Sequence, residues 1–114
     1  MCTQDHLKII TETMTQEYRR IFGHRLQQVY LYGSYARGDY DEESDIDIVG
    51  IVDYSETELS EANRKLSETA SDLGLKYDVL VSSAAIPAKR FNEYRDTLPY
   101  YQNILREGVE LIAG

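Results

Sequence analysis

Apolar residues recur at helical spacing in two long segments of the chain. In residues 3–22 they lie on one stripe made of Leu7, Ile10, Met14, Tyr18 and Ile21. A second stripe consists of Leu59, Ala62, Leu66, Ala70 and Leu73. It follows Ser55-Glu56-Thr57-Glu58, which resembles a capping box. Because such spacing gathers side chains on one face of a helix, we predict two amphipathic helices, ended by Gly23 and Gly74.

Three shorter runs have the composition of β-strands, with many valine, isoleucine and tyrosine residues. They are Leu26–Tyr32, Asp45–Val52 and Leu75–Ser82. In the third run, alternation places Tyr77, Val79 and Val81 on one side and Asp78 on the other. Pro87 and Pro99 are suited to the first turn of a helix, and predict two further helices that end near Thr97 and at Arg106, before Gly108.

The predicted order is helix, strand, turn, strand, helix, strand and two helices. Strands interleaved with helices indicate an α+β, two-layer fold with a small mixed β-sheet flanked by helices. A chain of 114 residues has the size of a single domain, so we assign residues 1–114 to one domain. The link between the first two strands is short enough for a hairpin-like, antiparallel arrangement. A crossover connection remains an alternative.

The formal net charge of −8 limits the partners that the chain can bind. An acidic surface repels a phosphate backbone, which argues against extended contact with nucleic acid, whereas one nucleotide with its metal ions remains compatible. Cys2 is the only cysteine, and the N-terminus lacks the apolar core of a signal peptide. No apolar run is long enough for a bilayer span. These features predict a cytoplasmic protein without a membrane partner.

The chemistry is concentrated in Gly33-Ser34, followed after ten residues by Asp45-x-Asp47. The glycine and serine end one predicted strand, and the two aspartates begin the next. Residues two apart on a strand point to the same face, and two carboxylates so close are costly unless a cation neutralises them. Mg²⁺ favours carboxylates together with substrate phosphates, and two such ions can activate a hydroxyl and stabilise leaving pyrophosphate. The pattern therefore predicts a nucleoside triphosphate site.

Two further residues, Asp78 and Arg37, extend this hypothesis. Burial of an unpaired carboxylate within an apolar strand is costly. As the third carboxylate of the metal site, Asp78 would be paired with a cation. Gly33 allows a phosphate to approach the backbone, Ser34 adds a hydroxyl and an N–H, and Arg37 can reach the same phosphates. The segment is not a Walker loop, because Gly-Lys-Ser/Thr is absent.

These residues resemble the nucleotidyltransferase superfamily that includes polymerase β. Within it, the chain is similar to minimal nucleotidyltransferases, the MntA-like antitoxins that are often paired with a HEPN-domain ribonuclease toxin. The segment Tyr100–Val109 is similar to the ends of such chains. The resemblance implies that Gly33 and Ser34 hold the triphosphate, that Asp45 and Asp47 bind both Mg²⁺ ions, and that Asp78 completes the site. It also implies transfer of AMP from ATP to a hydroxyl, which in toxin–antitoxin systems belongs to a tyrosine of the toxin.

Other interpretations of these residues remain open. Gly33-Ser34 could be an ordinary strand-ending turn, and the aspartates could continue a solvated acidic loop. A calcium loop that begins at Asp39 fails, because its sixth and twelfth positions are Ser44 and Gly50 rather than glycine and glutamate. Arg37 could be a surface residue paired with Asp39 or Asp41. Two other aspartates compete with Asp78 for the role of third carboxylate, namely Asp53 and Asp72.

Three alternative functions also remain. The acceptor could be a small molecule such as an aminoglycoside, with a homo-oligomer supplying the wall that one small domain lacks. The chain could instead retain nucleotide and act only by occluding its protein partner. Finally, it could be an acidic structural protein that mimics nucleic acid, in which case Mg²⁺-dependent nucleotide binding would be absent.

Overall fold

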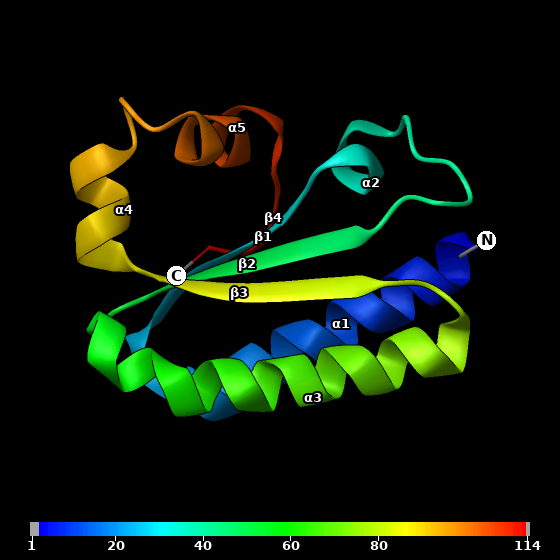
Figure 1. The fold of residues 1–114 in the computed structure, drawn as a ribbon, viewed down its shortest axis with the longest axis horizontal. Helices are drawn as coiled ribbons and strands as arrows, with labels where there is room; N and C mark the ends of the chain where they lie inside the picture. Colours follow the sequence, from blue (N-terminus) through cyan, green and yellow to red (C-terminus); the bar gives the residue numbers. More distant parts are fainter. Residues whose placement is uncertain (1–2, 114) are drawn as a thin grey trace.

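The computed structural model describes residues 3–113. A central β-sheet has helices on both faces (Figure 1). The long helices α1 (Gln4–Phe22) and α3 (Leu59–Tyr77) cover one face, and the shorter α4 (Ala88–Tyr94) and α5 (Pro99–Glu107) cover the other. The one-turn helix α2 (Ser34–Arg37) lies on the same side as α5. The predicted sheet flanked by helices is therefore confirmed.

The sheet has four strands in the order β3-β2-β1-β4. Their bounds are β1 Leu26–Tyr32, β2 Ile46–Val52, β3 Val81–Pro87 and β4 Val109–Ala113. Strand β1 is antiparallel to both β2 and β4, whereas β2 and β3 are parallel. The sheet is thus mixed, as predicted, and the link between β1 and β2 takes the hairpin-like course.

The two long helices begin and pack as their patterns predict. The Thr3 side chain accepts a hydrogen bond from the His6 N–H at 3.0 Å and so caps α1. Before α3, a 3₁₀ turn (Glu56–Glu58) carries the predicted capping box, in which the Glu58 carboxylate accepts from the Ser55 N–H at 3.0 Å. All five residues of the second stripe, Leu59, Ala62, Leu66, Ala70 and Leu73, are buried.

Strand β2 is central, and its two faces bury different cores. Ile46, Ile48 and Val52 belong to the core under α1 and α3. Val49 and Ile51 belong to the core under α4 and α5. Because successive side chains alternate between faces, Asp47 lies on the α4 and α5 side of the sheet.

Tyr18 joins α1 closely to the centre of the sheet. Its ring lies against Gly50, where an added Cβ would be 2.6 Å from the ring Cε1. Its hydroxyl donates to the Ala84 carbonyl at 2.6 Å and accepts from the Ala84 N–H at 3.2 Å. Burial raises the pKa of this phenol. Tyr18 therefore fixes helix α1 against the middle of strands β2 and β3.

The predicted strand Leu75–Ser82 is wrong. Helix α3 does not end at Gly74 but continues to Tyr77, and β3 begins only at Val81. The N–H groups of Asp78 and Val79 both donate to the Gly74 carbonyl. A Cβ at Gly74 would lie 2.6 Å from the Val79 carbonyl oxygen. The glycine therefore makes room for the turn that closes the helix, instead of marking its last residue.

The C-terminal part of the chain is partly as predicted. Helix α5 starts at Pro99 and is followed by Gly108, whereas α4 ends at Tyr94, three residues earlier than expected. Strand β4 was not predicted, and it pairs with the free edge of β1. Among residues 3–113, we find no helix with the length and apolar character that a membrane crossing requires.

Candidate functional site

Gly33 and Ser34 form the turn that the sequence predicts. Gly33 has φ 76° and ψ −158°, a backbone conformation that is essentially restricted to glycine. The N–H groups of Ala36 and Arg37 both donate to the Gly33 carbonyl at 3.1 Å, which starts the turn of α2. Gly38 closes this turn with φ 86°.

The turn lies directly beside the predicted carboxylate pair. Tyr32, at the end of β1, pairs with Asp47 of β2 in the antiparallel register, so the next residue, Gly33, is brought against the aspartate. A Cβ built on Gly33 would be only 2.5 Å from Asp47 Oδ2. Asp45 directly precedes β2, and both carboxylates are half-buried. The structure thus brings together the two halves of the motif.

Asp47 lies in surroundings that disfavour its ionised form. Burial raises the pKa of Asp47, the nearby charge of Asp45 raises it further, and Arg37 opposes both effects. A half-buried carboxylate close to a second one is stabilised by a cation. Such a perturbation is typical of a functional site.

Arg37 makes two ion pairs of its own. Its Nε lies 3.2 Å from Asp39 Oδ2, and its Nη1 lies 3.0 Å from Glu107 Oε2 at the end of α5. The interpretation that it pairs with Asp39 is therefore confirmed. Glu107 was not predicted as a partner, because the contact depends on how α5 packs. A role of Arg37 in phosphate binding stays a prediction.

Two tyrosines that we did not predict line the same region. The hydroxyls of Tyr32 and Tyr100 are 3.2 Å apart, and their rings meet edge to face with centroids separated by 5.8 Å. Burial is the main cause that raises both pKa values, and the charge of Asp47 contributes to each. Tyr32 directly precedes Gly33, which was the available signal in the sequence.

The structure does not place Asp78 beside Asp45 and Asp47 on the sheet. Asp78 is exposed and caps α3 with φ 54°. The residue of β3 that pairs with Asp47 is Ser82. Of the two rivals, Asp53 follows the opposite end of β2 and Asp72 is exposed on α3. In the described part of the chain, no three Asp, Glu, His or Cys residues gather closely enough to hold one metal ion.

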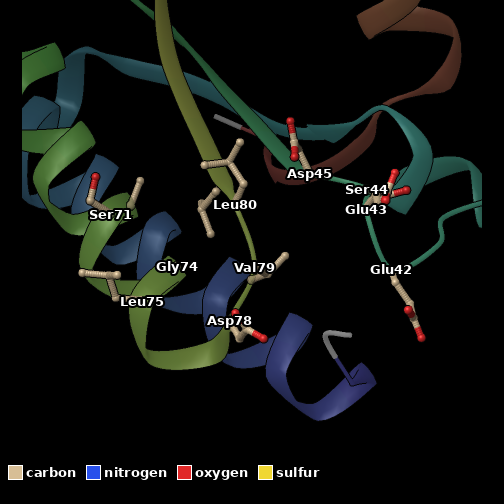
Figure 2. A pocket seen from close by; sticks show the side chains of 12 residues that line it. Glu42, Glu43, Ser44, Asp45, Ser71, Gly74, Leu75, Asp78, Val79 and Leu80 are labelled. Atoms are coloured by element: carbon tan, nitrogen blue, oxygen red, sulfur yellow. The ribbon is translucent and has the colours of Figure 1, made fainter.

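A hollow of about 500 Å³ nevertheless connects the two regions. It lies between the loop that leads into β2 and the last turn of α3 (Figure 2). Asp45 and Asp78 both line it, and in this view Asp45 lies above Val79 and Asp78 lies below it. The geometry therefore provides a pair of carboxylates at the sheet and a third one across the hollow.

Sequence comparisons identify the family of the chain. The family model for the nucleotidyltransferase domain matches residues 12–107. A candidate protein adenylyltransferase of Methanocaldococcus jannaschii is 42% identical over 76 residues, which are 67% of this chain and 74% of that protein. A second one from the same organism is 37% identical over 86 residues, or 74% of this chain and 76% of that protein.

Several solved structures with a similar fold come from toxin–antitoxin complexes. One complex contains MntA with two aspartate-to-glutamate substitutions two positions apart (TM-score 0.58, 20% identity, 91% of this chain and 73% of that one). A second was solved with AMP-PNP (TM-score 0.57, 23% identity, 90% and 73%). A third holds a tri-AMPylated HEPN toxin of Shewanella oneidensis with its MNT antitoxin (TM-score 0.54, 19% identity, 94% and 72%). These likenesses concern the fold alone. The match of the family model over residues 12–107 shows that the chain belongs to the nucleotidyltransferase family.

Proposed function

We propose that this nucleotidyltransferase transfers AMP from ATP to a hydroxyl group of a protein and releases pyrophosphate. The observation that carries the proposal is the close approach of Gly33 to Asp47, which joins the turn and the carboxylate pair into one site. The identity with candidate protein adenylyltransferases supports AMP as the transferred group and a protein as the acceptor.

The carboxylate pair fits the metal ions that such a reaction uses. Asp45 and Asp47 offer only oxygen ligands, and burial together with the charge of Asp45 raises the pKa of Asp47, which a bound cation would oppose. Each carboxylate has two oxygens, so the pair can contact two Mg²⁺ ions when phosphates and water supply the remaining ligands. Bound there, Mg²⁺ would offset the charge of the triphosphate and of the leaving pyrophosphate.

The remaining residues of the turn would bind the nucleotide. Gly33 has no side chain and permits a phosphate to approach the backbone, and Ser34 offers an N–H and a hydroxyl to the β- and γ-phosphates. Arg37 adds a positive charge at the edge of the site. In the transfer, the acceptor oxygen forms a bond to the α-phosphorus while the bond from that phosphorus to the bridging oxygen breaks. Pyrophosphate leaves with the electron pair, and the hydroxyl proton passes to water.

The role of Asp78 as third carboxylate stays a prediction that one substitution tests. Asparagine tolerates the left-handed conformation of this position, so Asp78→Asn should fold normally. A loss of transfer on the order of 100-fold would assign Asp78 to the reaction, as expected for a missing charged group. Unchanged transfer would leave Asp45 and Asp47 as the complete carboxylate set.

We further propose that the acceptor is a HEPN-type toxin and that the chain acts as its antitoxin. The similar solved structures support this partner, because one of them holds an AMPylated HEPN toxin together with its antitoxin.

Label transfer from α-³²P-ATP and Mg²⁺ into proteins of the host lysate tests the function. The double variant Asp45→Asn/Asp47→Asn should abolish the labelled band, whereas Asp53→Asn/Asp72→Asn, which changes aspartates outside the pair, should retain it. A band that persists in the first variant, or its absence with the unaltered chain, would contradict the proposal. The band itself identifies the acceptor, and a band other than a HEPN-type protein would exclude the antitoxin role.

A further inference from the structure

Two leucines beside the site are unusually exposed. Leu75, in the last turn of α3, is 85% exposed, and Leu80, just before β3, is 63% exposed. They are the two most exposed large apolar side chains of residues 3–113. Single apolar residues on a surface need no explanation, but an apolar patch with a polar rim marks an interaction site. Leu75 and Leu80 line the same hollow, so they form such a patch (Figure 2).

The backbone holds both leucines in place. Asp78 and Val79 donate to the Gly74 carbonyl and close the turn between the leucines. The Leu80 carbonyl accepts from the Ile46 N–H at 2.9 Å, which fixes Leu80 to the start of β2. The patch is therefore a preformed surface next to the carboxylate pair, and binding to it would cost little ordering of the chain.

The opposite wall of the hollow is also held in a defined shape. The ring of Tyr40 stacks on that of Tyr35, with centroids 4.3 Å apart, at the start of this loop. The Asp41 carboxylate accepts from the Glu43 N–H at 2.9 Å, and the Ser44 hydroxyl accepts from the Asp41 N–H at 2.9 Å. These contacts fix the shape of the loop, whose residues Glu42, Glu43, Ser44 and Asp45 line the hollow.

The rim of the hollow is entirely acidic. Its charged residues are Glu42, Glu43, Asp45 and Asp78, and no lysine or arginine lines it. Within residues 3–113, none of these four carboxylates takes part in an ion pair. Uncompensated charge of one sign around an apolar patch selects a partner of the opposite sign and repels nucleic acid.

We propose that this hollow docks a segment of the protein acceptor in which apolar side chains are flanked by lysine or arginine. The proposal rests on the adenylyl transfer proposed above. Leu75 and Leu80 receive the apolar side chains, and the acidic rim pairs with the basic ones. Asp45 belongs both to the rim and to the carboxylate pair, so a docked segment lies next to the reacting centre. The hollow thus selects the acceptor, while the turn and the pair perform the transfer.

Binding of short fluorescent peptides tests the docking without any need for catalysis. The probe has a central tyrosine between leucines and arginines, and two comparison peptides carry glutamate for arginine or serine for leucine. Fluorescence anisotropy is measured in the presence of AMP-PNP and Mg²⁺. The variants are Leu75→Gln/Leu80→Gln and Glu42→Gln/Glu43→Gln, none of which belongs to the proposed catalytic set. The control is Glu93→Gln/Tyr94→Gln on α4, at the other end of the sheet (Figure 1).

We expect the basic, leucine-containing peptide to bind best, and each hollow variant to weaken it at least about tenfold. The control variant should bind as the unaltered chain does, and added salt should weaken binding, since charge contributes. All these side chains are exposed, so melting temperatures should agree closely and exclude unfolding as the cause. Equal binding of the three peptides, no binding of any, or unchanged binding by the hollow variants would overturn the docking.

Transfer of label from α-³²P-ATP separates this proposal from the proposed function. If peptides bind as expected but neither they nor lysate proteins acquire label, the docking stands and the adenylyl transfer fails. If lysate proteins acquire label equally well with the leucine variant, the transfer stands and the docking fails. A polycationic aminoglycoside could also compete with the peptide for the hollow and acquire label. That result would identify a small molecule as the occupant of the hollow and overturn the inference.

Discussion

Replacement of Gly33 by alanine tests the link between the turn and the carboxylate pair. The new Cβ would start 2.5 Å from Asp47 Oδ2, whereas ordinary contact begins at 3.4 Å, so the oxygen must move by about 0.9 Å. Asp47 Cγ, at 3.5 Å, and its Cβ, at 3.7 Å, are already at ordinary distances. Rotation of the carboxylate is therefore sufficient, and this terminal torsion is soft.

Stability and activity should consequently respond differently. The backbone of Gly33 disfavours alanine by about 1–3 kcal/mol, and the soft rotation of Asp47 adds little. The displaced oxygen, however, can no longer hold a metal ion or phosphate in its original position. A misplacement of this size costs about 100-fold in rate. Gly33→Ala should therefore unfold at lower urea concentration and transfer label about 100 times more slowly while still folded.

Gly38→Ala is the matched control. Gly38 also has a positive φ of 86°, but no atom lies within 4 Å of its added Cβ. This variant should lose about 1–2 kcal/mol of stability and retain most of its transfer rate. Urea unfolding gives the first quantity, and label transfer from α-³²P-ATP at a temperature where both variants are folded gives the second. Equal rates for the two alanine variants would refute the reasoning.

Four further results are expected. Because the pKa of Asp47 is raised in the folded chain, the stability of the metal-free protein should fall as pH rises through that pKa. Asp47→Asn should therefore melt at a higher temperature than the unaltered chain at pH 7. Its melting temperature, measured with EDTA, should also depend less on pH. Tyr18→Phe leaves the polar groups of Ala84 without their partner and should cost about 1–3 kcal/mol in urea unfolding, with transfer retained. Gly50→Ala pushes against the Tyr18 ring and should also cost about 1–3 kcal/mol, or more, in the same experiment. Chelation of divalent ions should stop label transfer, and added Mg²⁺ should restore it.

Local patterns were sufficient for most of the fold. The two long helices and the strands β1 and β2 follow from periodicity and end signals, which act over neighbouring residues. The spacing between Gly33 and Asp47 also carried real information about the site, since antiparallel pairing through Tyr32 places the two residues in contact. Pro99 and Gly108 likewise predicted the two ends of α5 from local sequence alone.

The errors arose where distant contacts decide the structure. Gly74 resembles a helix end, yet a glycine within the helix costs only about 1 kcal/mol, and here it accommodates the returning Val79 carbonyl. Leu75 then appeared to begin a strand, although it is an exposed residue of α3. The start of β3 depends on its pairing with β2. Strand β4 forms by pairing with the edge of β1 that β2 leaves free. No local pattern shows these pairings. For this reason the prediction that Asp78 lies on a strand was wrong.

A crystal structure of the chain with AMP-PNP and Mn²⁺ would test the central claim most directly. We expect anomalous density for metal at Asp45 and Asp47, with the phosphates against Gly33 and Ser34. A triphosphate bound elsewhere, or metal absent from the two aspartates when the nucleotide is present, would contradict the account.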